Sequence, residues 1–430
     1  MNEVHAFIQN FAGNLEDFQQ INEFMKSQTH VMAANQSDTL RLIKNNTDAA
    51  KNSLIQLWLI TSLYQNKSAL HQFIDANDQI DLINNYFQNF VPLQVTTQNR
   101  KLYELATIFS ELLISEKKAI YGINTLKNVI FKVRQNDEQV CGSLHKEFAR
   151  LCIKAKCYQH SLIVIDHPVI QFKKNTSAMD ILNYMYYKAL IYTALKQFQN
   201  AIDCLKLVIS FPCQLTHKIH LESYKKLILL NLLEKGQMPD IPKYTNVMLK
   251  HNLETSFACY RNLGSSYIGK DDKLFNEIIE NNQEEFFKDK NYGLIKKLQK
   301  KYQRVRVKEL SNTYLTLRYN LTDNKEIEDT LFEMINQDES QAKIDSQKEM
   351  ISFIDSTSMT SASQQDDAKE AEYLTVIEEL ENQNQRIIKL MSNVQGLDKG
   401  LQLTKQFLQR NLNDRGGNSA RDDSGGDMMM

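Results

Sequence analysis

Histidine is one residue type in this chain that could hold a metal ion. Two of the nine histidines, His217 and His220, stand three residues apart and could share one face of a helix. Such a pair can begin a zinc site, but no carboxylate or third ligand stands at a supporting spacing, and no HExxH pattern occurs. A polar start to a helix explains the pair better, so we expect no metal there.

The six cysteines could act as metal ligands or nucleophiles, yet none belongs to a CxxC pair. Cys152 and Cys204 fall inside helical apolar patterns, which predicts free buried thiols in a reducing compartment. The chain also lacks the glycine-rich phosphate loops and the GxSxG nucleophile elbow. We therefore expect neither catalysis nor a cofactor.

Positive charge gathers in one stretch, residues 288–308, where only Asp289 opposes it and Glu309 follows. This stretch could contact an acidic partner or nucleic acid, or it could be a solvated helix face balanced by the upstream acids Glu280, Glu284 and Glu285. The net charge of −1 provides no global attraction to nucleic acid. We favour the balanced face or a protein partner. The basic residues are Lys288, Lys290, Lys296, Lys297, Lys300, Lys301, Arg304, Arg306 and Lys308.

The elements that carry these residues are predicted to be helical. At 430 residues the chain is too long for one ordinary core, and it contains few turn-forming residues, 13 Gly and 5 Pro. Its first residues lack a basic start and a long apolar run, so we expect no signal peptide there. The apolar stretch 54–63 is too short to span a bilayer. We expect a soluble protein of the cytoplasm and nucleus, without membrane contact.

A repeat is visible from about residue 140. Ala149 and Tyr158 stand in the same order as Ala189 and Phe198, and the two aromatic residues are 40 positions apart. Antiparallel helices need a small residue where they cross and a ring beside it, which is typical of tetratricopeptide-like repeats. The pattern predicts a degenerate all-α solenoid, and residues 1–140 carry helical periodicity without a clear repeat.

A different pattern follows the solenoid. Two helices are predicted at 312–319 and 325–337, followed by a hairpin of strands 342–344 and 350–353. Helices followed by a hairpin are typical of a winged-helix module.

The predicted winged helix is better suited to protein than to DNA. Its candidate recognition helix, 325–337, holds one lysine against four acidic residues, so DNA phosphates would repel it. A sheet edge at Ile344 or Ile351 could instead be extended by a neighbour's strand. The predicted contact residues of this wing are Ile344, Met350, Ile351 and Phe353.

Residues 356–369 form a polar linker, and a heptad pattern follows it. Apolar residues recur there in steps of four and three, with Asn384 as a polar residue in the seam, where it would set register and partner. The tail from 413 cannot bury a core and is expected to be disordered. The predicted contact residues of the tail helix are Ile377, Leu380, Asn384, Ile387, Met391 and Val394.

Several blocks of the chain resemble a known family. They are MYYKALIYTALKQFQNAIDCLKLVISFP (185–212), HKIHLESYKKLILLNLLEKG (217–236), NYGLIKKLQKKYQRVRVKELSNTYLTL (291–317) and IDSQKEMISF (344–353). Together they resemble the PCI-domain family, which is shared by the proteasome lid, the COP9 signalosome and translation initiation factor three. The central blocks are most similar to the third subunits of the signalosome.

The resemblance implies a non-catalytic scaffold subunit of the complex that removes Nedd8 from cullins and so regulates cullin-RING ubiquitin ligases. The zinc chemistry of that complex belongs to another subunit. Its PCI subunits align their winged helices edge to edge and gather their C-terminal helices into a bundle. The implied partners are other PCI subunits, with subunits one and eight as neighbours in a hetero-oligomer. The alternatives are a PCI subunit of a related complex, or a nucleic-acid adaptor that uses 288–308.

The predicted architecture is an all-α helical-repeat solenoid followed by a winged-helix module, which together form a PCI domain, and then a C-terminal helix. The predicted boundaries are N-terminal helical repeats at 1–140, the helical-repeat part of the PCI domain at 141–290, the winged helix at 291–355, the linker at 356–369, the bundle helix at 370–412 and the disordered tail at 413–430.

Overall fold

The computed structural model divides into two compact units, Met1–Leu310 and Ser311–Met430. The predicted linker, the predicted disordered tail, and Ile377 and Leu380 lie outside the residues it describes. The described residues are 2–11, 18–45, 52–66, 70, 73–95, 98–134, 140–167, 171–172, 176–212, 216–243, 245–255, 257–314, 316–318, 331–335, 342–345, 350–353, 381, 383–385, 387–388, 391–392 and 394.

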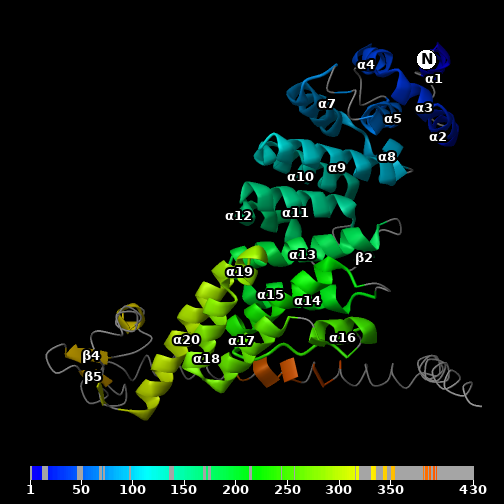
Figure 1. Ribbon diagram of the computed structural model, residues 1–430. Helices are drawn as coiled ribbons and strands as arrows, with labels where there is room; N and C mark the ends of the chain where they lie inside the picture. Colours follow the sequence, from blue (N-terminus) through cyan, green and yellow to red (C-terminus); the bar gives the residue numbers. More distant parts are fainter. Residues whose placement is uncertain are drawn as a thin grey trace, which may run out of the picture. The chain divides into compact units, whose positions relative to one another are not determined.

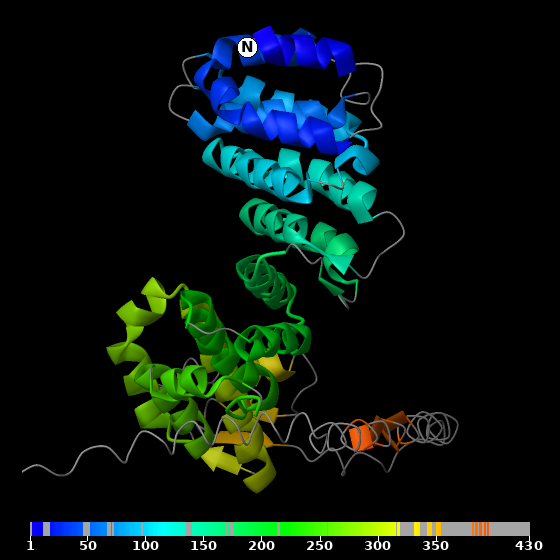
Figure 2. The same cartoon turned by 90° about the vertical axis from the view of Figure 1, so that its right-hand side faces the viewer.

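The first unit is a stack of helices (Figures 1 and 2). Its N-terminal half contains α1 (Asn2–Phe11), α2 (Phe18–Ser27), α3 (Thr29–Ala34), α4 (Gln36–Asn45), α5 (Ser53–Leu63), η1 (Tyr64–Asn66), α7 (Ala76–Asn89), α8 (Pro92–Val95), α9 (Asn99–Ser115) and α10 (Ala119–Arg134). All eleven residues of α5 are buried, so this helix is the centre of its half. No helix in the described part of the chain is both long and apolar enough to cross a membrane.

The second half of the stack continues the layers (Figure 1). It contains α11 (Ser143–Ala155), α12 (Tyr158–Ile165), α13 (Ala178–Ala194), α14 (Phe198–Ser210), α15 (Lys218–Lys235), α16 (Val247–Thr255), α17 (Ala258–Gly269), α18 (Asp272–Asn281), α19 (Gln283–Lys288) and α20 (Tyr292–Thr313). Short parallel strands β1 (Val140–Cys141) and β2 (Gln171–Phe172) pair beside α11 and α13. The predicted all-α solenoid is confirmed.

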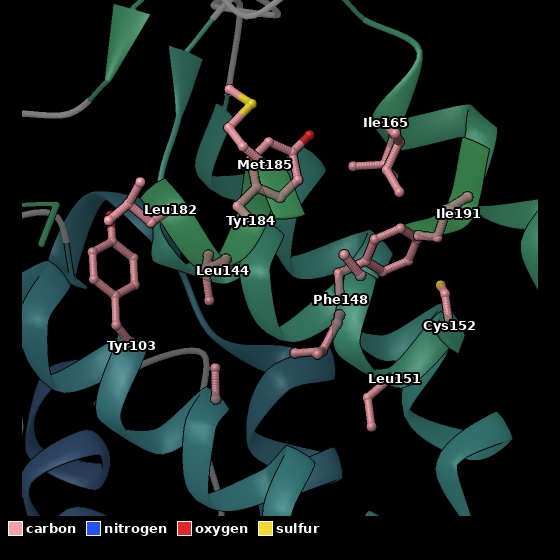
Figure 3. Close-up of a cluster of buried hydrophobic side chains, with 14 of the residues drawn as sticks. Tyr103, Leu144, Phe148, Leu151, Cys152, Ile165, Leu182, Tyr184, Met185 and Ile191 are labelled. Atoms are coloured by element: carbon pink, nitrogen blue, oxygen red, sulfur yellow. The ribbon is translucent and has the colours of Figure 1, made fainter. Parts of the chain in front are cut away.

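One apolar core runs through the stack from Val4 to Tyr302. Figure 3 shows part of it, where Phe148 and Cys152 of α11 face Ile165 of α12 and Ile191 of α13. Cys152 and Cys204 are free and buried, as predicted. The small residues of the repeat, Ala149 and Ala189, are buried as well.

The helix α10 packs tightly at Gly122. A β-carbon placed there would lie 2.2 Å from Leu113 Cδ1 of α9 and 2.9 Å from Leu151 Cδ1 of α11. These separations are far below van der Waals contact, so a larger residue would force the buried side chains of Leu113 and Leu151 to move. Gly122 therefore lets α10 pack against helices of its own layer and of the next.

A recurrent turn joins the helices of each layer. Lys117, Lys156 and Lys196 each end a helix in the left-handed conformation, with φ of 57°, 58° and 63°, and Gly236 does so at 68°. Their spacings of 39, 40 and 40 residues match the 40-residue repeat predicted from Tyr158 and Phe198. The amide after each lysine donates back across the turn, as from Cys157 N to Cys152 O at 3.0 Å, which is the bond pattern of a Schellman cap.

The second unit contains a three-stranded antiparallel sheet. Its strands are β3 (Thr316–Arg318), β4 (Ala342–Asp345) and β5 (Met350–Phe353), in the order β3-β5-β4. The predicted hairpin is confirmed, with Ile344 of β4 opposite Ile351 of β5. Residues 331–335 are helical, and Leu331 and Met334 are buried there.

The predicted helix at 312–319 is wrong. The preceding helix, α20, ends at Thr313, and β3 follows it within three residues. Thr316, Leu317 and Arg318 pair with Ser352, Ile351 and Met350 of β5. Pairing with a strand more than thirty residues away decides the conformation here, and local helical spacing carries no information about that partner.

The left-handed lysines generate a stability prediction. Lys156→Gly should raise the free energy of unfolding by about 0.5–1 kcal/mol, because glycine adopts positive φ without the β-carbon clash. Lys154→Gly, two residues earlier on the exposed face of α11, should lower it by about 1 kcal/mol, because glycine is a poor helix former. Urea unfolding followed by circular dichroism measures both changes. A loss of stability in Lys156→Gly equal to that in Lys154→Gly would show that the left-handed conformation at Lys156 does not favour glycine.

Candidate assembly surfaces

The paired histidines cap a helix. His217 precedes α15, and its backbone N–H donates to Nδ1 of His220 at 3.1 Å. His220 is fully buried, and burial, followed by the nearby His217, lowers the pKa of its imidazole. The polar helix start expected from sequence is thus confirmed. No three histidine, cysteine, aspartate or glutamate side chains come together as metal ligands among the described residues.

A buried polar network joins α15 to the turn before α20. Lys225 Nζ lies 2.7 Å from Asp289 Oδ1, and the hydroxyl of Tyr260 donates to Asp289 Oδ2 at 2.8 Å. Asn291 Nδ2 donates to the same tyrosine hydroxyl at 3.0 Å, and Lys226 Nζ donates to Asn291 Oδ1 at 2.9 Å. Both oxygens of Asp289 are therefore committed to the interior.

The two lysines of this network respond differently to burial. Burial opposes the charged form of Lys225, but its hydrogen bond to Asp289 and the charge of Glu222 raise its pKa overall. Burial dominates for Lys226 and lowers its pKa. Lys225 donates to a carboxylate at 2.7 Å, whereas the hydrogen bond of Lys226 goes to a neutral amide and its nearest carboxylate, that of Glu222, is 3.9 Å away.

A cavity of about 950 Å³ opens between α5, α9, α11 and the start of α13. Its charges are paired locally, since Lys146 Nζ lies 2.8 Å from Asp180 and 2.9 Å from the buried Glu147, and Lys101 lies 3.1 Å from Glu104. Ser110 and Thr107 of α9 also donate to Glu147. The ion pair between Lys146 and Asp180 joins α11 to α13. The charged residues of the cavity therefore connect neighbouring layers of the stack.

Some residues of the basic stretch have structural roles. Lys301 Nζ donates to the carbonyl oxygens of Leu233 and Glu234 and so caps the end of α15. Arg306 pairs with Asp272 at 3.1 Å and with Glu309 at 3.2 Å. The upstream acids Glu280, Glu284 and Glu285 form no ion pair with the basic stretch in the described part of the chain. The charge balance expected from those three acids is therefore not formed by direct pairs.

The predicted wing residues occupy different places in the sheet. Ile344 lies in β4, an edge strand of the described sheet, whereas Met350, Ile351 and Phe353 lie in the central strand β5. The backbone of β5 is paired on both sides, and Ile351 is buried. Ile351 therefore fills the core of the module, and the strand edge that remains on this side belongs to β4.

The predicted tail seam is partly described. The described residues between 381 and 394 are helical, and Asn384 is exposed. Three seam residues, Ile387, Met391 and Val394, are 53%, 58% and 62% exposed. Ile388, which the heptad pattern left out, is 65% exposed. An apolar stripe of this kind on a helix is typical of a surface that another helix covers.

The fold defines the class of the protein, a helical-repeat protein, whose described tail residues leave apolar side chains exposed. The family model "COP9 signalosome complex subunit 3, N-terminal helical repeats" matches residues 15–249, more than half of the chain. The chain therefore belongs to the COP9 signalosome subunit 3 family.

Two relatives are similar over most of their length. The chain is 28% identical over 342 residues to COP9 signalosome complex subunit 3 of Dictyostelium discoideum, and this alignment covers 77% of this chain and 79% of the relative. It is 24% identical over 420 residues to COP9 signalosome complex subunit 3 of Arabidopsis thaliana, and that alignment covers 95% of this chain and 93% of the relative. The family expected from the sequence is thus confirmed.

The cap at His220 generates a pH prediction. Its pKa is lowered in the folded state, so the unfolded chain takes up a proton first as the pH falls below about 6.5. The free energy of unfolding should therefore fall from pH 6.5 downward, through the lowered pKa of the folded state. His220→Gln should show a smaller fall over that interval, and His251→Gln, an exposed position on α16, should keep the wild-type slope. Urea titrations at several pH values measure the free energy of unfolding of each protein. Identical pH slopes in all three proteins would contradict the prediction.

The buried network generates a second prediction. Asp289→Ala should lower the free energy of unfolding by about 3–5 kcal/mol, because it leaves the ammonium of Lys225 buried without its nearest carboxylate. Asp240→Ala removes the same group from an exposed position and should change stability by less than about 0.5 kcal/mol. Thermal or urea unfolding compares the two. Equal, small effects would mean that Lys225 is adequately held by Glu222 alone.

Proposed function

We propose that this chain is a structural subunit of the COP9 signalosome, the complex that removes Nedd8 from cullins, and that it contributes assembly instead of catalysis. The observation that carries the proposal is the exposed apolar stripe of the tail helix in a chain that belongs to this family. Four large apolar side chains that are each more than half exposed are costly in water. A bundle of helices from other subunits would cover them.

The winged-helix module supplies the second contact. Its assignment to 291–355 is supported by the end of α20, the helical residues 331–335 and the sheet order β3-β5-β4. The strand β4 leaves a backbone edge among the described strands, and a neighbouring subunit would extend the sheet there. Ile344 lies on that edge, whereas Met350, Ile351 and Phe353 act by holding the module together.

The proposed division of labour places chemistry elsewhere in the complex. The sequence lacks the histidine-rich zinc signature of an isopeptidase, so the zinc-dependent step would belong to another subunit. The proposed partners are other PCI subunits, with subunits one and eight as neighbours, in a hetero-oligomer of the cytoplasm and nucleus. Its effect on cullin-RING ligases would then be indirect, through the integrity of the complex.

Ile387→Asp tests the tail seam. The carboxylate would be buried against apolar side chains in the bundle, so recovery of the other subunits with the tagged chain should fall by roughly tenfold or more. Ser392→Asp adds the same charge one residue from Met391 on the same helix and should leave recovery unchanged. Affinity purification of each tagged variant from its own cells, with quantitative mass spectrometry, measures both.

The folded first unit, Met1–Leu310, which we call the stem, provides the internal control of that experiment. Both variants should unfold at the same temperature as the wild type, since the tail helix lies outside the first unit. Full recovery of signalosome subunits with Ile387→Asp would reject the tail seam as an assembly surface. Recovery of ribosomal or RNA-bound proteins in place of signalosome subunits would reject the proposed function itself.

A further inference from the structure

Two aromatic rings stack where α19 turns into α20. The ring centroids of Phe287 and Tyr292 are 4.0 Å apart with an interplanar angle of 22°. Tyr292 is held from two further directions, because Gln283 Nε2 donates to its hydroxyl at 3.1 Å and Lys296 Nζ lies 5.0 Å from its ring centroid. Phe287 is nevertheless 55% exposed. A ring fixed on one face and open on the other is a rigid anchor for an apolar side chain.

Four exposed lysines stand within five residues of these rings in the sequence. Lys288 and Lys290 are exposed on either side of Asp289 in the turn. Lys296 and Lys297 are exposed on α20, and helical geometry places them away from Ile295, Leu298 and Tyr302, which face the core. We call the set of Phe287, Tyr292, Lys288, Lys290, Lys296 and Lys297 the aromatic–lysine patch (α19 and α20 in Figure 1).

Two of the nearby carboxylates, those of Asp289 and Glu309, are engaged by other partners. Asp289 is turned inward, with one oxygen on Lys225 and the other on Tyr260. Glu309 is taken by Lys270 at 2.7 Å and by Arg306 at 3.2 Å. In the described part of the chain, Lys288, Lys290, Lys296 and Lys297 have no carboxylate partner. The positive charge that the sequence shows is therefore available at the surface.

We propose that the aromatic–lysine patch binds an acidic linear segment of a partner protein, with one aromatic side chain of that segment packed on Phe287. The patch offers a single open ring, whereas single-stranded nucleic acid is held by several successive stacking surfaces along a basic groove. The exposed acids Glu284 and Glu285 of α19 adjoin the rings in sequence and would repel a continuous phosphate backbone. A short peptide with a few carboxylates avoids them. This proposal does not depend on incorporation into the signalosome.

Fluorescence anisotropy with the full chain tests the patch. The probes are a fluorescein-labelled dodecapeptide of Gly and Ser that carries three Glu and one central Phe, the same peptide with Ala in place of Phe, and a labelled uridine dodecamer. The proteins are the wild type, Lys296→Glu/Lys297→Glu, Lys288→Glu, and the control Lys26→Glu/Lys154→Glu. The control changes the net charge equally at exposed positions of α2 and α11.

The wild type should bind the Phe peptide at low salt, and the Ala peptide about fivefold more weakly, because the apolar anchor is lost. Lys296→Glu/Lys297→Glu should weaken binding of the Phe peptide by about tenfold and Lys288→Glu by about threefold, with the control within about twofold of wild type. Lys288→Glu lies outside α20. Its peptide affinity therefore still tests the patch if circular dichroism shows that the double variant is misfolded.

Three results with the peptides would overturn the proposal. They are a wild type that does not bind the Phe peptide, equal losses in the control and patch variants, and equal affinity for the Phe and Ala peptides. Tighter binding of the uridine dodecamer than of the Phe peptide, lost in the patch variants, would also overturn it and would assign the surface to nucleic acid. None of these readings involves other signalosome subunits, so failure here and failure of the proposed function are distinguishable.

Discussion

The described helices of the first unit bury their apolar surfaces by packing layer against layer, and the rest of the structure depends on that constraint. The helix α5 is buried on every side, and α15 buries twelve of its eighteen residues. Each is covered only because layers on both sides are present, so one core extends from Val4 to Tyr302. This is the nearest-neighbour stability typical of solenoids. It also explains Gly122, since close layers leave no room for a side chain where helices cross.

The same constraint shapes the polar interior. Where α15, α17 and the turn before α20 meet, the stack buries Lys225, Lys226 and Asn291, and these groups are tolerated because Asp289 and Tyr260 supply partners. Turning Asp289 inward has a consequence outside the core. It removes a carboxylate from the surface of a lysine-rich turn, so a stabilising interaction in the interior determines the charge of the exterior.

The continuous core and the proposed assembly surfaces lie in different units. The stem contains the core, whereas the described tail residues Ile387, Ile388, Met391 and Val394 each have more than half of their side chain exposed. The family model matches residues 15–249, which lie within the stem, while the proposed contact surfaces lie in the second unit.

The sequence by itself determined the features that local spacing encodes. The 40-residue repeat, the buried cysteines, the cap at His217 and the hairpin around Ile344 and Ile351 all follow from helix and strand periodicity, and the structure contains them. The family resemblance likewise followed from short residue blocks.

Only the tertiary structure decided the rest. It placed Ile351 in the central strand, formed β3 within the expected helix at 312–319, and showed that lysines in the left-handed conformation follow five of the described helices. It also turned Asp289 away from the lysines beside it in sequence. These outcomes depend on partners distant along the chain, whose hydrogen bonds and packing outweigh local preferences of a few tenths of a kcal/mol to about 1 kcal/mol per residue.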